Sequence, residues 1–339
     1  MGQRQLPSTF IEGEDRMFRS SHRVRDQIMV VLAVVLAVPA LAQARSAKPA
    51  VSTGAVADLT HQSATLLGKV NASGARTTYF FQYGPTTHYG AVTPTGVAAA
   101  GAGTVTITAP LAGLASFTTY HYRLVAHNRN GTTRGSDRTF KTNRQALGLV
   151  LAAAPNPVGF GQPTVLAGTL SGTGNVGRRI VLQSNPFPYT TGFAAAANVQ
   201  LTNAAGQFAF PLLSVALNTQ YRAVMPDKPE VASPIVGVGV AVRVGTYTSR
   251  RVVRRGGSVR FSGTVRPARP GAQYAIQLLR RGAWRTVAGG ITHGTGGGVS
   301  RYAKRVRIRR GGQYRVFVSI VDGNFVSSVG RVVKIRRRF

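Results

Sequence analysis

Apolar and polar residues alternate along many short segments of this chain. Between Val259 and Val265, apolar residues and one glycine occupy every second position, and arginine, serine and threonine stand between them. The segment from Tyr314 to Ile320 alternates in the same way. A period of two places successive side chains on opposite faces of an extended strand. Because 40 glycines and 17 prolines punctuate such segments, the sequence predicts an all-β protein of short strands and turns.

A weak pattern recurs with a period of just under 100 residues, the length of one β-sandwich domain. In each copy, a glycine within a strand pattern precedes a Tyr-Arg pair, by 54, 53 and 51 residues in turn. These glycines and tyrosines are Gly68 and Tyr122, Gly168 and Tyr221, and Gly263 and Tyr314. Gln183 and Gln277 add a further match between the second and third copies. The repeat predicts three tandem sandwiches, which must be stable without disulfides because the chain has no cysteine.

The first copy resembles a fibronectin type III domain over residues 51–142. The resemblance is carried by residues 63–70, 78–84 and 114–131. In the last of these, Leu114, Thr118 and Tyr120 stand at the spacing of the family's tyrosine-corner strand, although Ser116 replaces the usual proline and the early tryptophan is absent. The later two copies look like bacterial immunoglobulin-like domains. The resemblance implies sandwiches that serve as spacers or as adhesive or carbohydrate-facing modules, with Tyr120, Tyr221 and Tyr314 as structural tyrosines.

The N-terminal segment has the features of a secretory signal peptide. Residues 28–38 form an unbroken apolar run, preceded by arginines and followed by Pro39, Ala40, Leu41 and Ala42. Cleavage after Ala42 is expected, and Met17 is the alternative start. An uncleaved anchor is the other interpretation, but the apolar stretch is shorter than the roughly 20 residues of a membrane span.

The predicted organisation follows from these patterns. It comprises a signal peptide at 1–42, a linker at 43–50, a fibronectin type III-like sandwich at 51–142, an immunoglobulin-like sandwich at 145–240 and a basic immunoglobulin-like sandwich at 241–339. Such a chain is expected to be secreted and to lie outside the cell, released or retained at the cell surface.

Few residues support catalysis. Beyond residue 42 the chain has only five acidic residues, and the one close pair, Asp227 and Glu230, lies in a proline-rich turn. A glycosidase needs two facing carboxylates, and the scattered histidines have no partners at metal-ligand spacing. We therefore expect no enzyme, no cofactor, no metal site and no small-molecule substrate.

Positive charge is the strongest functional signal. The net charge is +33, and residues 241–339 hold 23 lysines and arginines against one acid, Asp322, whereas the second copy is nearly neutral. The candidate polyanion-binding residues are Arg254, Arg255, Arg280, Arg281, Arg305, Arg307, Arg309, Arg336, Arg337 and Arg338. Arg305, Arg307 and Arg309 alternate with apolar residues and are expected on one sheet face, and the other clusters are expected at turns and at the tail. The expected partner is an anionic cell-wall polymer or acidic polysaccharide, with extracellular nucleic acid or an anionic lipid surface as alternatives. A purely compositional arginine bias is the competing interpretation.

Aromatic residues suggest a second class of function. Trp284 follows a hairpin-like segment, and Phe187 and Tyr189 lie in a proline-rich loop. These rings are candidates for stacking on neutral glycans, although a core or edge-strand position is the simpler role for Trp284. The two hypotheses are therefore a structural and adhesive protein that binds polyanions, and a neutral glycan-binding protein.

Overall fold

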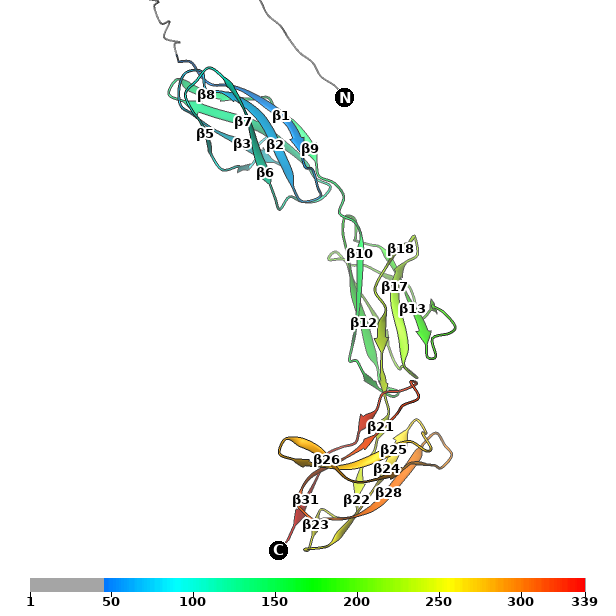
Figure 1. Cartoon of the computed structure of the whole chain (residues 1–339). Helices are drawn as coiled ribbons and strands as arrows, with labels where there is room; N and C mark the ends of the chain where they lie inside the picture. The colour runs from blue at the N-terminus through cyan, green and yellow to red at the C-terminus, as the bar shows by residue number, and fades with distance from the viewer. Residues whose placement is uncertain (1–45, 339) are drawn as a thin grey trace, which may run out of the picture. The chain divides into compact units, whose positions relative to one another are not determined.

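The computed structural model describes residues 46–338, and every regular element in that range is a β-strand (Figure 1). The predicted all-β fold of tandem sandwiches is confirmed. The predicted signal peptide lies outside the described residues. A search of the described range finds no helix with the length and apolar character needed to span a bilayer.

Two antiparallel sheets contain the first nine strands. One has the order β1-β2-β6, and the other has the order β4-β3-β7-β8, with β5 also paired to β3 and β9 to β7. Leu66 of β2, Phe81 of β3 and Tyr122 of β7 share one core, so the sheets pack face to face. The strands are β1 Ala50–Ala57, β2 Ala64–Asn71, β3 Thr77–Gly84, β4 Ala91–Val92, β5 Gly96–Ala98, β6 Thr104–Leu111, β7 Thr119–Asn128, β8 Gly131–Arg134 and β9 Arg138–Lys141.

The next strands form a second sandwich. Its sheets have the orders β10-β12-β16 and β14-β13-β17-β18, with β15 paired to β13, β19 to β17, and β11 parallel to β20. Leu166, Ile180 and Phe210 are buried between these sheets. The strands are β10 Gly148–Ala154, β11 Val158–Gly159, β12 Thr164–Ser171, β13 Arg179–Pro186, β14 Ala194–Ala195, β15 Gln200–Leu201, β16 Gln207–Leu212, β17 Thr219–Met225, β18 Lys228–Ala232, β19 Val236–Val238 and β20 Val240–Ala241.

The remaining strands form the third sandwich. One sheet has the order β21-β24-β28-β27, with β22 paired to β24, and the other has the order β23-β31-β29-β25-β26, with β30 paired to β29. Phe261, Ile276 and Val316 fill its core. The strands are β21 Arg243–Val244, β22 Tyr247–Thr248, β23 Val252–Val253, β24 Ser258–Arg266, β25 Gln273–Arg280, β26 Ala283–Ile291, β27 His293–Gly294, β28 Ser300–Arg307, β29 Gly312–Val318, β30 Ser328–Val329 and β31 Val333–Arg337.

The repeated glycines occupy the same place in the second and third sandwiches. Gly168 of β12 lies opposite Phe208 of β16, and Gly263 of β24 lies opposite Tyr302 of β28. A Cβ atom on either glycine would collide with that aromatic side chain and with a backbone oxygen of the strand or segment on its other side. Glycine is required here because backbone and ring approach too closely for any side chain.

The segment at the predicted boundary between residues 240 and 241 takes part in strand pairing. β20 spans these two residues and pairs with β11, and Ala241 also forms a bridge with Val326 of the third sandwich. Strand pairing therefore continues through this point of the chain. The domain limits themselves stay a prediction.

Candidate polyanion-binding surface

Arginines line the outer face of the sheet β21-β24-β28, which we call the arginine face. Along β24, Val259 and Phe261 are fully buried, whereas Arg260 between them is exposed. The same alternation exposes Arg305 and Arg307 on either side of buried Val306 in β28. The arginine face comprises Arg243, Arg260, Arg266, Arg301, Arg305 and Arg307.

The strand register sets some of these arginines directly against each other. Arg260 lies opposite Arg305, and Arg243 lies opposite Arg266. Like charges in directly opposed positions destabilise an antiparallel pair. The one acidic residue of 241–339, Asp322, instead lies 3.8 Å from Nε of Arg269. The arginine face therefore carries positive charge that no carboxylate of this sandwich neutralises.

A groove of about 480 Å³ borders the arginine face, and we call it the arginine groove. Four arginines line it together with five apolar or aromatic residues. One of the five is buried Tyr314, whose hydroxyl donates a hydrogen bond to the carbonyl oxygen of Arg310 at 2.7 Å. The lining residues are Leu278, Val287, Ala288, Arg305, Val306, Arg307, Arg309, Arg310 and Tyr314.

Other predicted arginines gather at one end of the same sandwich. Arg254 and Arg338 line a hollow of about 520 Å³ together with Arg250. Arg337 donates a hydrogen bond from Nη1 to the carbonyl oxygen of Arg309 at 2.7 Å, which places Arg337 beside the arginine groove. These contacts bring together residues that are far apart in the sequence.

The last predicted arginines occupy turns and strands. Arg255 lies in the turn before β24. Arg281 and Gly282 form the β25–β26 hairpin turn, and both of these residues have a positive φ. Arg280 ends β25 and is half-buried. Arg336, which the sequence suggested for a turn or tail, lies in β31 beside Arg337, because this segment pairs with β29 and β23.

Trp284 is held against an arginine. The guanidinium carbon of Arg315 lies 4.3 Å from the centroid of the indole ring, and Nε of Arg315 donates to Oε1 of Gln277 at 2.8 Å. One face of the ring is therefore occupied. Trp284 is half-buried on β26, so only part of it is open to a ligand.

The same glutamine–arginine–aromatic arrangement occurs in all three sandwiches. The Nε to Oε1 distance is 2.8 Å in each. The distance from the guanidinium carbon to the ring centroid is 4.6 Å in the first and 4.4 Å in the second. The sets are Gln82, Arg123 and Tyr89, then Gln183, Arg222 and Phe193, then Gln277, Arg315 and Trp284. This arrangement explains why the glutamine and the arginine of the Tyr-Arg pair recur in the sequence.

The other two candidate stacking rings contact each other. The rings of Phe187 and Tyr189 meet edge to face with centroids 5.5 Å apart. Phe187 is half-buried, and a Cβ atom on Gly323 would contact its ring at 2.6 Å. Tyr189 is 37% exposed. Tyr189 is therefore the more open of the two rings.

The structural tyrosines are buried. The hydroxyl of Tyr120 accepts a hydrogen bond from the backbone N–H of Ala115 at 2.9 Å, five residues upstream. This is the geometry of a tyrosine corner. Burial raises the pKa of Tyr221, and a hydrogen bond with Thr219 opposes the shift. Burial likewise raises the pKa of Tyr314, partly offset by the charge of Arg280.

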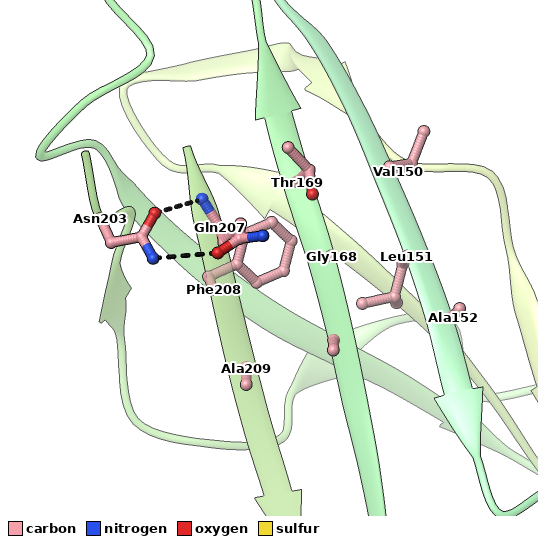
Figure 2. A pocket seen from close by; sticks show the side chains of 10 residues that line it. Val150, Leu151, Ala152, Gly168, Thr169, Asn203, Gln207, Phe208 and Ala209 are labelled. Atoms are coloured by element: carbon pink, nitrogen blue, oxygen red, sulfur yellow. Dashed lines mark hydrogen bonds between the residues drawn. The ribbon is translucent and has the colours of Figure 1, made fainter. Parts of the chain in front are cut away.

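The second sandwich has a wider hollow of different chemistry (Figure 2). About 610 Å³ lies over β10, β12 and β16, where Ala152, Gly168 and Ala209 leave the surface low. Figure 2 shows Asn203 and Gln207 hydrogen-bonded at its edge, with Nδ2 of Asn203 3.2 Å from Oε1 of Gln207. The residues that line it carry no charge. The larger hollow is therefore uncharged, and the arginines lie around the smaller ones.

Several arginines of the surface were absent from the sequence-based candidates. Arg243, Arg260, Arg266 and Arg301 lie on the arginine face, and Arg310 lines the arginine groove. Arg260 occupied a polar position of a recognised alternating segment, so its exposure was predictable. Its position opposite Arg305 depends on strand register, which a single sequence does not specify.

Comparison with known proteins adds structural similarity only. No protein-family model matches the chain, and no curated protein matches it. Similar solved structures include a tetra-tandem repeat in the extending region of a large adhesion protein, with 16% identity, a TM-score of 0.26, and coverage of 86% of this chain and 74% of that one. Chicken CNTN1 FN1–FN3 domains share 12% identity at a TM-score of 0.27, with coverage of 86% and 100%. The Yersinia pseudotuberculosis adhesin InvE shares 14% identity at a TM-score of 0.25, with coverage of 55% and 58%.

Proposed function

We propose that this chain is a non-enzymatic structural and adhesive protein of the cell exterior, which attaches to anionic polymers through its third sandwich. The observation that carries the proposal is the direct opposition of Arg260 and Arg305 on an exposed sheet face. Such a pair weakens the sheet by about 0.2–1 kcal/mol unless an anion lies between the guanidinium groups.

The distribution of charge supports the same function. An arginine bias spread by composition alone would place arginines on equivalent faces of neighbouring sandwiches. Instead, the hollow over β10, β12 and β16 is uncharged, whereas the matching sheet of the third sandwich carries the arginine face. The first two sandwiches then act as spacers on the N-terminal side of the attachment surface. The apolar N-terminal segment supports export.

The arrangement of Trp284 gives less support to the alternative, a neutral glycan-binding protein. A stacking platform needs an open ring face. Arg315 covers one face of Trp284, and Phe187 and Tyr189 pack against each other.

The test is retention of the full chain on immobilised polyphosphate and polygalacturonate as salt is raised. Changing Arg260, Arg301, Arg305 and Arg307 to serine should weaken binding at low salt roughly 10- to 100-fold, since each exposed charge contributes up to about 1 kcal/mol. Raised salt should release the wild type from both columns.

The matched control removes the same charge elsewhere. Arg76, Arg129 and Arg134 of the first sandwich and Arg179 of the second are exposed, and their replacement by serine should leave retention close to that of the wild type. Equal losses in both variants would show that net charge alone governs binding, and the proposal would fail.

A further inference from the structure

A shallow groove of about 390 Å³ lies on the arginine face itself, apart from the arginine groove. Its volume is at the lower end of the range of small-ligand sites. The residues that line it are Tyr247, Arg260, Ser262, Gly263, Thr264, His293, Arg301, Tyr302 and Ala303. It therefore combines two tyrosines, two arginines, a histidine, a serine and a threonine.

The ring of Tyr247 is exposed although its strand is fixed. Tyr247 lies in β22 opposite Ser262, and 69% of its surface is accessible. The two residues before Tyr247 are fixed by hydrogen bonds to buried Tyr302. Its hydroxyl donates to the carbonyl oxygen of Gly245 at 2.7 Å and lies 3.1 Å from Oγ1 of Thr246. Tyr247 is thus an open aromatic surface on a tethered strand, and packing of the fold does not account for it.

Cations stand on both sides of this ring. Arg260 lies two residues from Ser262 along β24, and Arg301 lies opposite Thr264, two residues from Ser262 in the other direction. At about 3.4 Å per residue, the positions of Arg260 and Arg301 are separated by roughly 14 Å along the strand direction. His293 lies opposite Arg301 on β27. The floor between the arginines is low because Ser262, Thr264 and Ala303 are short.

We infer that this groove binds an acidic saccharide unit of an anionic polysaccharide, an inference that rests on the proposed function and narrows its ligand class. The Tyr247 ring stacks on the apolar face of the sugar, as aromatic side chains do with flat apolar surfaces. Arg260 or Arg301 forms paired hydrogen bonds with the carboxylate, since the guanidinium fork matches carboxylate geometry. The hydroxyls of Ser262 and Thr264 are placed to exchange hydrogen bonds with sugar hydroxyls.

The composition of the groove favours a saccharide over the other polyanions. Single-stranded nucleic acid is bound by successive aromatic rings on which successive bases stack. In this groove Tyr302 is buried, and the two exposed rings, those of Tyr247 and His293, lie three strands apart in the sheet, on β22 and β27. Attachment to a lipid surface uses large apolar side chains beside the cations. The lining residues of this groove include no large aliphatic side chain.

The experiment compares Tyr247→Ala with the wild type, both as full chains, for affinity to polygalacturonate, polyphosphate and single-stranded oligothymidylate. Tyr247→Ala should weaken polygalacturonate binding roughly five- to tenfold and leave polyphosphate binding within about twofold, because a stacking contact is worth about 1 kcal/mol. Tyr247→Phe keeps the ring and should bind like the wild type. Tyr189→Ala removes an exposed ring of the second sandwich and should also bind like the wild type.

Three results would overturn the inference and leave the proposed function standing. These are unchanged polygalacturonate binding in Tyr247→Ala, equal losses for polygalacturonate and polyphosphate, and a loss confined to oligothymidylate, which would identify nucleic acid as the ligand. Failure of the wild type to bind any of the polymers would instead reject the proposed function, and the inference with it. Because 69% of Tyr247 is exposed, its removal should leave the circular dichroism spectrum unchanged.

Discussion

The sheets β10-β12-β16 and β21-β24-β28 have matching strand registers, but the outer face of the first has an uncharged hollow and the outer face of the second is lined by arginines. In the second sandwich Ala167 lies opposite Ala209, and Thr169 lies opposite Gln207. The corresponding pairs in the third are Ser262 with Ala303 and Thr264 with Arg301.

The difference shows that the inner face of a strand forms the core, whereas the outer face sets the surface chemistry. On the inner faces both sandwiches bury large apolar side chains, among them Leu166 and Phe210 in one and Phe261 and Val265 in the other. On the outer faces nothing in the fold dictates residue type. The second sandwich therefore has an uncharged hollow there, whereas the third has the arginine face, and function belongs to the surface rather than to the fold.

The largest expected effect tests whether the inner faces are equivalent. Phe210→Ala and Phe261→Ala each remove a ring that is at most 1% exposed, and each should lower the free energy of unfolding of its sandwich by about 3–5 kcal/mol. Urea unfolding followed by circular dichroism measures the loss. The outer-face controls Thr169→Ala and Thr264→Ala should stay within about 0.5 kcal/mol of the wild type. A loss below about 1 kcal/mol in either core variant would mean that the sandwiches are not built alike.

An intermediate effect comes from the ring opposite the repeated glycine, which is Phe208 in one sheet and Tyr302 in the other. Burial raises the pKa of Tyr302 to about 12. Because the folded state holds this proton more tightly than the unfolded chain, the stabilisation is complete below about pH 10 and is lost as pH rises from about 10 to about 12. The loss should be roughly 2 kcal/mol and confined to the third sandwich.

The measurement compares urea midpoints of the wild type and Tyr302→Phe at pH 9, 10, 11 and 12. The wild type should lose more stability than the variant over this interval. Other tyrosines also have raised pKa values in both proteins, so the difference between the two reports on Tyr302 and on its interaction with the adjacent Tyr274. These tyrosines are Tyr89, Tyr122, Tyr221, Tyr274 and Tyr314. A difference that does not change with pH would contradict the prediction.

Local patterns in the sequence predicted much of the fold and part of the surface. Alternation in residues 305–309 was sufficient to place Arg305 and Arg307 on one face, because a strand turns every second side chain outward, but Arg309 lies beyond the end of β28. The repeated glycines and Tyr-Arg pairs predicted three copies. In each copy the arginine lies directly opposite the repeated glutamine on the neighbouring strand.

The rest depended on which strands meet. The opposition of Arg260 and Arg305 joins residues that are 45 positions apart, and its register is set by tertiary packing. The rings that cover the repeated arginines differ in type, and Phe193 follows its glutamine by ten positions, whereas Tyr89 and Trp284 follow theirs by seven. Arg336 was expected in a turn or the tail, but hydrogen bonding to neighbouring strands extends β31 through Arg337.

The smallest expected change in stability comes from exchanging charged and uncharged residues between the outer faces of the two sheets. Arg305→Glu replaces an opposed pair of like charges with an opposed pair of unlike charges, and it should raise the free energy of unfolding of the third sandwich by about 0.5–1 kcal/mol at low salt. The reciprocal change, Ala167→Arg with Ala209→Arg, creates an opposed arginine pair in the second sandwich and should lower its stability by a similar amount. Both shifts should shrink at about 1 M salt, where charges are screened within about 3 Å. If Arg305→Glu raised stability equally at low and high salt, the gain would not come from relief of charge repulsion. The opposed arginines would then not destabilise the sheet electrostatically, and the strongest reason to place an anion between them would be lost.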